Sequence, residues 1–221
     1  MGKGSIRAYA SGDVTMFQPS AKLCESLHRL RPFLLIMAGS YLLSGTLGSL
    51  LVSLQINPFI FSRIPTFEVL AGARPIVDIL GKLRAGHVAQ AVGYTFAWNF
   101  GVAALLTSTA AGVVFFLPPI IGAWRGFLVG VLFHGQWGSL PVATLFLGTF
   151  LLEIGAYVIA GAAGMGFGFA LLPRRSGDGI RRRAGRALQD ILTVYPLVAG
   201  MLFCGAVWEI LGIYSLSRLV G

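Results

Sequence analysis

The chain alternates long apolar stretches with short polar segments rich in basic residues. The longest apolar stretch, residues 140–172, contains one charged residue, Glu153. It cannot be folded away in the core of a soluble domain of 221 residues, and it exceeds the roughly 20 residues that a helix needs to cross a bilayer. We therefore predict an all-α fold, a polytopic membrane helix bundle of about five transmembrane helices. The predicted spans cover residues 32–54, 91–117, 120–133, 140–172 and 191–214.

The polar segment at the amino terminus differs from the rest of the chain. Residues 1–31 form a basic amphipathic segment, and residues 32–221 form the transmembrane helical domain. In the first segment Leu23, Leu27 and Leu30 share one helical face. This pattern predicts a short helix that lies on the membrane surface.

A second polar segment, residues 55–90, separates the first two spans. In it Ile76, Ile79, Leu80 and Leu83 fall at i, i+3, i+4 and i+7, which places them on one face of a helix. We predict a short amphipathic helix there, lying on the bilayer or capping the bundle on the extracytoplasmic side.

The net charge of +9 has two explanations, nucleic-acid binding or membrane topology. The basic residues lie in loops beside apolar spans and lack interleaved aromatic residues, so topology is favoured and no nucleic-acid partner is expected. Residues 1–31 and the Arg-rich loop 173–190 are then both cytoplasmic, which predicts a multi-pass protein of the cell inner (cytoplasmic) membrane. The arginines expected to contact lipid headgroups or a cytoplasmic partner are Arg174, Arg175, Arg181, Arg182 and Arg183.

Composition supports this class of protein and adds a packing prediction. Hydrophobic residues make up 56% of the chain and charged residues 11%, against about 25% charged in soluble domains. The 30 glycines indicate close contact between helices, because a residue without a side chain lets two backbones approach. The glycines predicted to pack helices are Gly122, Gly126, Gly130, Gly161, Gly164 and Gly168.

Polar residues inside the spans are the candidate functional groups. Glu153 is the sharpest candidate, because a carboxylate in lipid must be paired, protonated or solvated by a cavity. It is either a polar group at a transport or partner-coupling site, or a protonated carboxyl that bonds to a neighbouring helix. Asn99 is favoured as a structural residue that hydrogen-bonds between helices.

Two further charged residues lie nearer the predicted ends of spans. Arg125 could pair with Glu153 or extend to the cytoplasmic interface, and its long stem favours the second arrangement. Glu209, beside Trp208, is predicted to reach the outer interface.

Patterns of catalytic residues are missing from the sequence. It contains no HExxH, no GxSxG with plausible partners and no Walker loop, and its three histidines show no metal-ligand spacing. The glycine-rich residues 161–168 lie inside a span without a preceding soluble strand, so helix packing explains them better than phosphate binding. We expect no enzyme activity, no metal and no cofactor.

One part of the chain resembles a known family. Residues 151–164, LLEIGAYVIAGAAG, resemble the signature of the stage II sporulation protein M family, in which a glutamate precedes an (I/A)-A-G-x-x-G run in a late membrane helix. Asn99 matches a polar Asn that opens an earlier helix, and Arg125-Gly126 falls where Asn-Gly usually begins the next. The resemblance covers roughly residues 90–172.

The chain departs from the family pattern at three places. It has Thr149-Phe150 where the family often has His-Gly, Gly155 where it often has Pro, and Arg125 in place of the usual Asn. These changes are those of a divergent member.

The resemblance implies a non-enzymatic integral membrane protein, whose sporulation relative holds peptidoglycan-degrading partners at the membrane. We therefore expect a scaffold or accessory subunit of a larger envelope complex, with membrane lipids and other membrane or envelope protein subunits as partners. The alternative is a small-solute permease or channel subunit that uses Glu153, with Asn99 and Arg125, as polar steps along its path.

Overall fold

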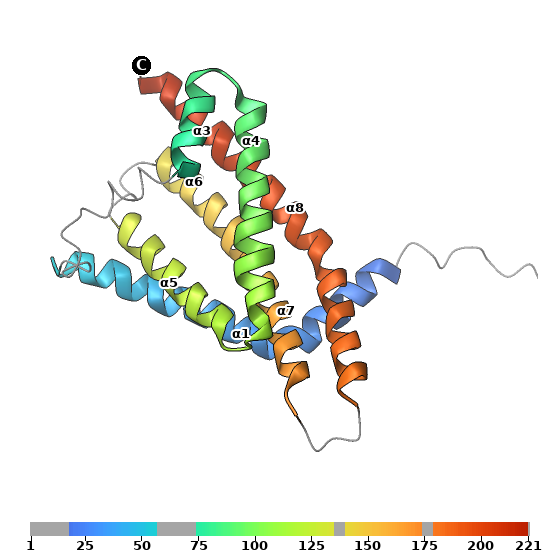
Figure 1. Ribbon diagram of the computed structural model, residues 1–221. Helices are drawn as coiled ribbons and strands as arrows, with labels where there is room; N and C mark the ends of the chain where they lie inside the picture. Colours follow the sequence, from blue (N-terminus) through green and yellow to red (C-terminus); the bar gives the residue numbers. More distant parts are fainter. Residues whose placement is uncertain (1–17, 57–73, 135–139, 174–178, 221) are drawn as a thin grey trace, which may run out of the picture.

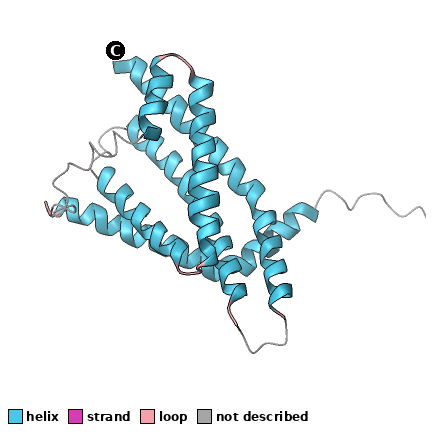
Figure 2. Ribbon diagram, viewed as in Figure 1, coloured by secondary structure: helices cyan, strands magenta, loops and turns pink. Residues whose placement is uncertain are grey.

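The computed structural model describes residues 18–56, 74–134, 140–173 and 179–220, and its elements in these ranges are all helical (Figures 1 and 2). The predicted all-α fold is therefore confirmed. In chain order the elements are α1 (Gln18–Ser53), α3 (Arg74–Arg84), α4 (Val88–Ala97), η1 (Trp98–Thr109), η2 (Ala110–Val113), α5 (Leu117–Leu132), α6 (Leu140–Thr149), η4 (Phe150–Ile154), α7 (Gly155–Leu171) and α8 (Ile180–Val220).

Four helical segments of the described chain are long and apolar enough to cross a membrane, and a fifth is apolar but shorter. The shorter one is α5, which corresponds to the short predicted span 120–133. Pro118 and Pro119 lie in its first turn, where a helix needs no backbone N–H donors. The four long segments are Ser20–Ser53, Val88–Val113, Leu140–Leu171 and Ile180–Leu216.

Two of the long segments are composite helices. The second joins α4 to the π-helical η1 and the 3₁₀ turn η2, and the third joins α6 to α7 through the π-helical η4. π-Helical turns use i→i+5 hydrogen bonds, and they change which side chains face a neighbouring helix. These two segments matter for the polar site described below.

Helix α1 continues through Pro32 as one element and changes direction along its length (Figure 1). The prediction of a separate surface helix near its start is therefore wrong. Leu30 is buried against Ala163 and Val194, and Leu23 and Leu27 pack against the same cluster. The apolar stripe covers other helices of the bundle instead of lipid, because those helices expose complementary apolar surface.

The centre of the bundle is built around α7. Its alanines and glycines leave room for α1, η1 and α8 to pack closely on its different sides. Two larger residues, Met37 of α1 and Leu202 of α8, are fully buried against it. The buried cluster consists of Met37, Tyr41, Ala103, Ala104, Ala156, Tyr157, Ala160, Ala162, Met165, Val198 and Leu202.

The amphipathic helix predicted over residues 76–83 is α3, which lies beside α4 at the upper end of the bundle in Figure 1. It ends in a left-handed Gly86 with φ of 76°, and the His87 N–H returns to the Lys82 carbonyl. The Tyr94 hydroxyl donates a 3.1 Å hydrogen bond to Asp78, so α3 is fixed to the start of the second long segment. The end of α7 and the start of α8 lie at the opposite end of the bundle (Figure 1).

Candidate intramembrane polar site

Glu153 and Asn99 meet inside the bundle. The Asn99 side-chain amide donates a 2.7 Å hydrogen bond to Glu153 Oε1, across 54 positions of sequence. Both side chains are half-buried. The structure thus brings together two residues that the sequence suggested separately, as a direct contact between the second and third long segments.

Each member of this pair lies in a π-helical segment, Asn99 in η1 and Glu153 in η4. Such segments make up well under 1% of residues in ordinary proteins, and they occur frequently at functional sites. A π-helical turn rotates the following side chains relative to an uninterrupted α-helix. Here both rotations occur where two polar side chains must meet in an apolar environment.

Helix α8 packs against the Glu153 side chain at Gly205. A Cβ atom at Gly205 would stand 3.1 Å from Glu153 Cγ and 3.4 Å from Leu152 Cβ. Gly205 itself is buried. The absence of a side chain there lets α8 approach the glutamate stem, which a substitution with a larger residue would push away.

Arg125 does not reach outward to the interface, so the favoured prediction for it is wrong. Its Nη1 donates to the Ala103 carbonyl at 3.2 Å and to Ser108 Oγ at 3.4 Å, and its Nη2 donates to Thr107 Oγ1. The guanidinium also lies 5.1 Å from the centre of the Tyr157 ring. The π-helical η1 offers the guanidinium one backbone carbonyl and two hydroxyls as acceptors. The apolar side chains of the bundle offer it none.

A second polar contact, which the sequence reasoning missed, joins three helices nearby. The Tyr195 hydroxyl of α8 donates to Thr109 Oγ1 at 2.8 Å, and the Thr109 hydroxyl donates to the Ala160 carbonyl of α7 at 3.0 Å. The run Thr107-Ser108-Thr109 inside an apolar span was a detectable signal, because three consecutive hydroxyls in lipid require partners.

Glu209 is half-buried and lines a mainly apolar cavity of about 450 Å³. That it reaches the outer interface stays a prediction. The cavity extends between α6 and α8, and it reaches Thr149, whose buried hydroxyl has no hydrogen-bond partner among the described residues. The adjacent Trp208 donates its indole N–H to the Leu145 carbonyl at 3.1 Å.

The predicted packing glycines form two contact surfaces. On α5, a Cβ at Gly126 would lie 2.5 Å from the Tyr41 carbonyl oxygen, and one at Gly130 would collide with the backbone of Gly45. On α7, a Cβ at Gly164 would lie 2.5 Å from the Thr109 carbonyl oxygen. Of the remaining three glycines, Gly122 faces Tyr41 and Gly161 faces Met37. Gly168 faces the backbone of Gly112.

The predicted arginine group falls partly outside the described residues. Arg174 and Arg175 belong to the part that the structure leaves out, while Arg181 and Arg182 are exposed on the first turn of α8. Arg183 turns back toward α7, and its Nη2 donates a 3.0 Å hydrogen bond to the Leu172 carbonyl.

These features define an all-α membrane protein whose few polar groups are enclosed by closely packed helices. Among the described residues, no three His, Cys, Asp or Glu side chains lie together as a metal-binding group.

The family described as Stage II sporulation protein M matches residues 33–211, which include Asn99, Arg125 and Glu153. The chain therefore belongs to that family, and the resemblance first suggested by residues 90–172 is confirmed over a much longer range. No curated protein and no solved structure gives a significant match.

Proposed function

We propose that this protein is a non-enzymatic membrane scaffold or accessory subunit of a larger envelope complex in the cytoplasmic membrane. Membership of the family supports a role as an integral membrane protein. The observation that carries the proposal is the direct backbone contact between helices at glycines. Gly130 meets the backbone of Gly45, and Gly168 meets that of Gly112.

Such contacts favour a rigid bundle over a moving one. Two helices that touch backbone to backbone have little freedom to slide, because any displacement brings neighbouring side chains into collision. A rigid bundle suits a protein that holds partners in fixed positions.

The surface that we propose for partners is the outer face of α3. Val77 and Leu80 are 52% and 38% exposed there. Two contacts hold α3 against α4. The Tyr94 hydroxyl is hydrogen-bonded to Asp78, and Lys82 Nζ lies 4.9 Å from the centre of the Tyr94 ring. An apolar face held in a fixed orientation loses little conformational entropy when a partner binds.

The test is purification of the full chain in mild detergent followed by native mass spectrometry. We expect a partner in fixed stoichiometry with the wild type, and loss of that partner in the double variant Val77→Glu and Leu80→Glu. Leu188→Glu is the matched control, because Leu188 is 49% exposed near the start of α8. A solitary chain with measurable turnover, or equal loss of the partner in both variants, contradicts the proposal.

A small-solute permease or channel subunit is the second candidate, and one observation favours it. The Asn99–Glu153 pair lies in π-helical segments, and the cavity beside Glu209 opens to Thr149, four positions before Glu153 in the chain. In a proteoliposome flux assay Glu153→Gln would abolish flux through such a path. Flux that is absent in the wild type, or unchanged in the variant, removes this candidate.

A further inference from the structure

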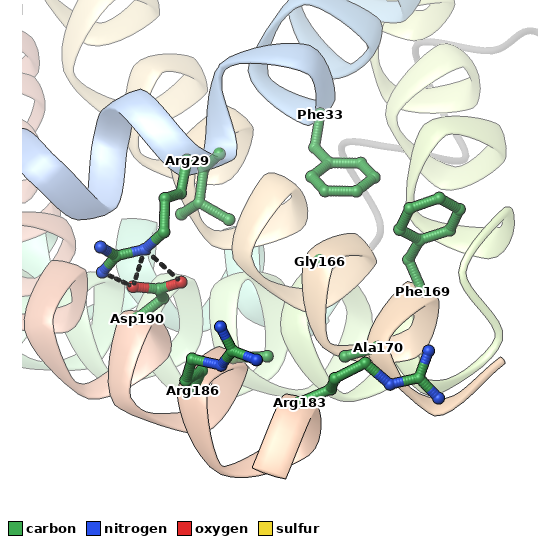
Figure 3. A pocket seen from close by; sticks show the side chains of 10 residues that line it. Arg29, Phe33, Gly166, Phe169, Ala170, Arg183, Arg186 and Asp190 are labelled. Carbon is green, nitrogen blue, oxygen red and sulfur yellow. Dashed lines mark hydrogen bonds and ion pairs between the residues drawn. The ribbon is translucent and has the colours of Figure 1, made fainter. Parts of the chain in front are cut away.

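A cavity of about 350 Å³ lies where α1, the last turns of α7 and the first turns of α8 converge (Figure 3). One of its walls is basic, with Arg29 from α1 and with Arg183 and Arg186 from the first turns of α8. Among the described residues that line it, Asp190 is the only acidic one, so these residues together carry a net charge of +2.

Asp190 forms an ion pair with Arg29. Arg29 Nε donates to its two carboxylate oxygens at 3.2 and 3.3 Å, and Nη2 approaches Oδ1 at 2.5 Å (Figure 3). The guanidinium also bonds to Ser26 at 3.1 Å and to Glu25. Arg29 and Asp190 thus form a fixed ion pair at one side of the cavity.

Two donors of the Arg183 guanidinium have no acceptor in the described part of the chain. Its Nη2 bonds to the Leu172 carbonyl, but Nε and Nη1 are buried and have no hydrogen-bond partner among the described residues. A guanidinium keeps its charge at all pH values met in a cell, and a buried donor without an acceptor costs about 1–3 kcal/mol or more. An anionic acceptor in the cavity would remove this cost after a small rotation of the guanidinium.

The opposite wall of the cavity is apolar. Phe33 and Phe169 meet edge to face with their ring centroids 5.5 Å apart (Figure 3). Gly166 packs directly against Leu30, where a Cβ atom would stand 3.0 Å from Leu30 Cδ2. A ligand that fits both walls carries an anionic group at one end and hydrocarbon at the other. A free inorganic anion would leave the aromatic wall unused.

We propose that this pocket, formed by Arg29, Phe33, Phe169, Arg183 and Arg186, binds the phosphate group of an acidic phospholipid, with an acyl chain against the two aromatic rings. Basic pockets between membrane helices bind lipid headgroups by charge-assisted hydrogen bonds to phosphate. The site does not depend on the scaffold role, and it applies equally to a transport protein.

The test compares two double variants of the full chain in detergent micelles that contain phosphatidylglycerol or phosphatidylcholine. One is Arg183→Gln with Arg186→Gln, in the pocket. The other is Arg181→Gln with Arg182→Gln, which removes the same charge from the same helix at exposed positions that do not line the cavity. Affinity is measured by native mass spectrometry as the fraction of protein that retains lipid.

We expect the wild type to retain phosphatidylglycerol in preference to phosphatidylcholine. The pocket variant should lose about tenfold in affinity, about 1.4 kcal/mol, because it removes charge-assisted hydrogen bonds to the phosphate, and the control variant should lose less than about twofold. Equal losses in the two variants would show binding by general surface charge and would overturn the proposal. Displacement of the lipid by an equal concentration of inorganic phosphate would also overturn it, in favour of a free-anion site.

A second measurement avoids the risk that the pocket variant does not fold. Wild-type protein in vesicles that contain a phosphatidylglycerol with a photoreactive acyl chain should form adducts on the peptides that carry Phe33 and Phe169. Adducts confined to other lipid-facing helices contradict the proposed position of the acyl chain.

Discussion

Among single residues, Asn99 decides the environment of the glutamate in the third long segment. Its amide is the hydrogen-bond donor that the structure gives to Glu153, at 2.7 Å. The side chains are half-buried, and Gly205 of α8 brings a helix backbone against the glutamate stem. Removal of the donor leaves a carboxyl group in an apolar site without this partner.

We therefore predict that Asn99→Leu lowers the free energy of unfolding by about 1 kcal/mol and by at most ~2, the range measured for hydrogen bonds between membrane helices. Asn99→Gln is the control, because it keeps the amide and should recover part of the loss. Reversible unfolding in mixed micelles measures both. Equal stability of Asn99→Leu and the wild type would mean that this hydrogen bond contributes nothing.

Arg125 is a charged residue that neutral polar groups hold within the bundle. Because its two terminal nitrogens bond to Ala103, Thr107 and Ser108, we expect Arg125→Met to lower the thermal midpoint by several degrees. Arg125→Lys should recover only part of the lost thermal midpoint, since a single ammonium group cannot reproduce the forked donor geometry of a guanidinium. Thermal denaturation in detergent measures the three proteins. Full recovery by lysine would indicate that charge alone matters.

The ion pair between α1 and α8 is asymmetric in its exposure. Asp190 is 6% exposed, whereas the Arg29 side chain is 44% exposed. Arg29→Met should therefore cost about 1–3 kcal/mol, because it leaves a buried carboxylate unpaired, while Asp190→Asn should cost less, because water and Glu25 still solvate Arg29. Chemical unfolding of both variants measures the difference. A larger cost for Asp190→Asn would reverse this assignment.

Among the elements, glycine positions set which helices come into contact. Gly126 and Gly164 would each place a Cβ 2.5 Å from a backbone carbonyl oxygen of another segment. We expect Gly126→Leu and Gly164→Leu to separate α5 from α1 and α7 from η1, with a loss of at least about 1–3 kcal/mol in stability and loss of the assembled protein. Size-exclusion chromatography in detergent, with recovery of the folded peak, is the measurement.

Matched controls for this prediction are glycines of two other helices, Gly39 of α1 and Gly200 of α8. A Cβ at Gly39 or Gly200 would meet nothing within 4 Å, so Gly39→Leu and Gly200→Leu should leave the chromatographic profile unchanged. If all four variants behave alike, the effect comes from leucine in lipid and not from helix packing.

For the whole molecule, the start of α8 and α3 lie at opposite ends of the bundle (Figure 1). The positive-inside rule then predicts a cytoplasmic α7–α8 turn and an extracytoplasmic α3. A membrane-impermeant maleimide should label Cys24 only from the cytoplasmic side, because Cys24 is exposed near the start of α1. Gly81→Cys in a background without native cysteines should be labelled only from the opposite side, and the reverse result would invert the topology.

The sequence by itself determined the class of protein, the family resemblance and the approximate position of each apolar helix. These follow from hydropathy and from the requirement that backbone groups in lipid be bonded within helices, and neither depends on which helices are neighbours. Glycines at four-residue spacing likewise predicted close approach, although they did not identify the partner helix.

Only the tertiary structure decided which polar side chains meet. The π-helical turns of η1 and η4 rotate Asn99 and Glu153 toward each other, and hydropathy does not distinguish an i→i+5 from an i→i+4 turn. The destinations of Arg125, Glu209 and the leucines near the start of α1 depended on surfaces contributed by distant parts of the chain. A polar side chain in an apolar interior forms hydrogen bonds with whichever polar groups lie next to it. Helix packing decides which groups these are, and the order of residues along the chain does not show which helices are neighbours.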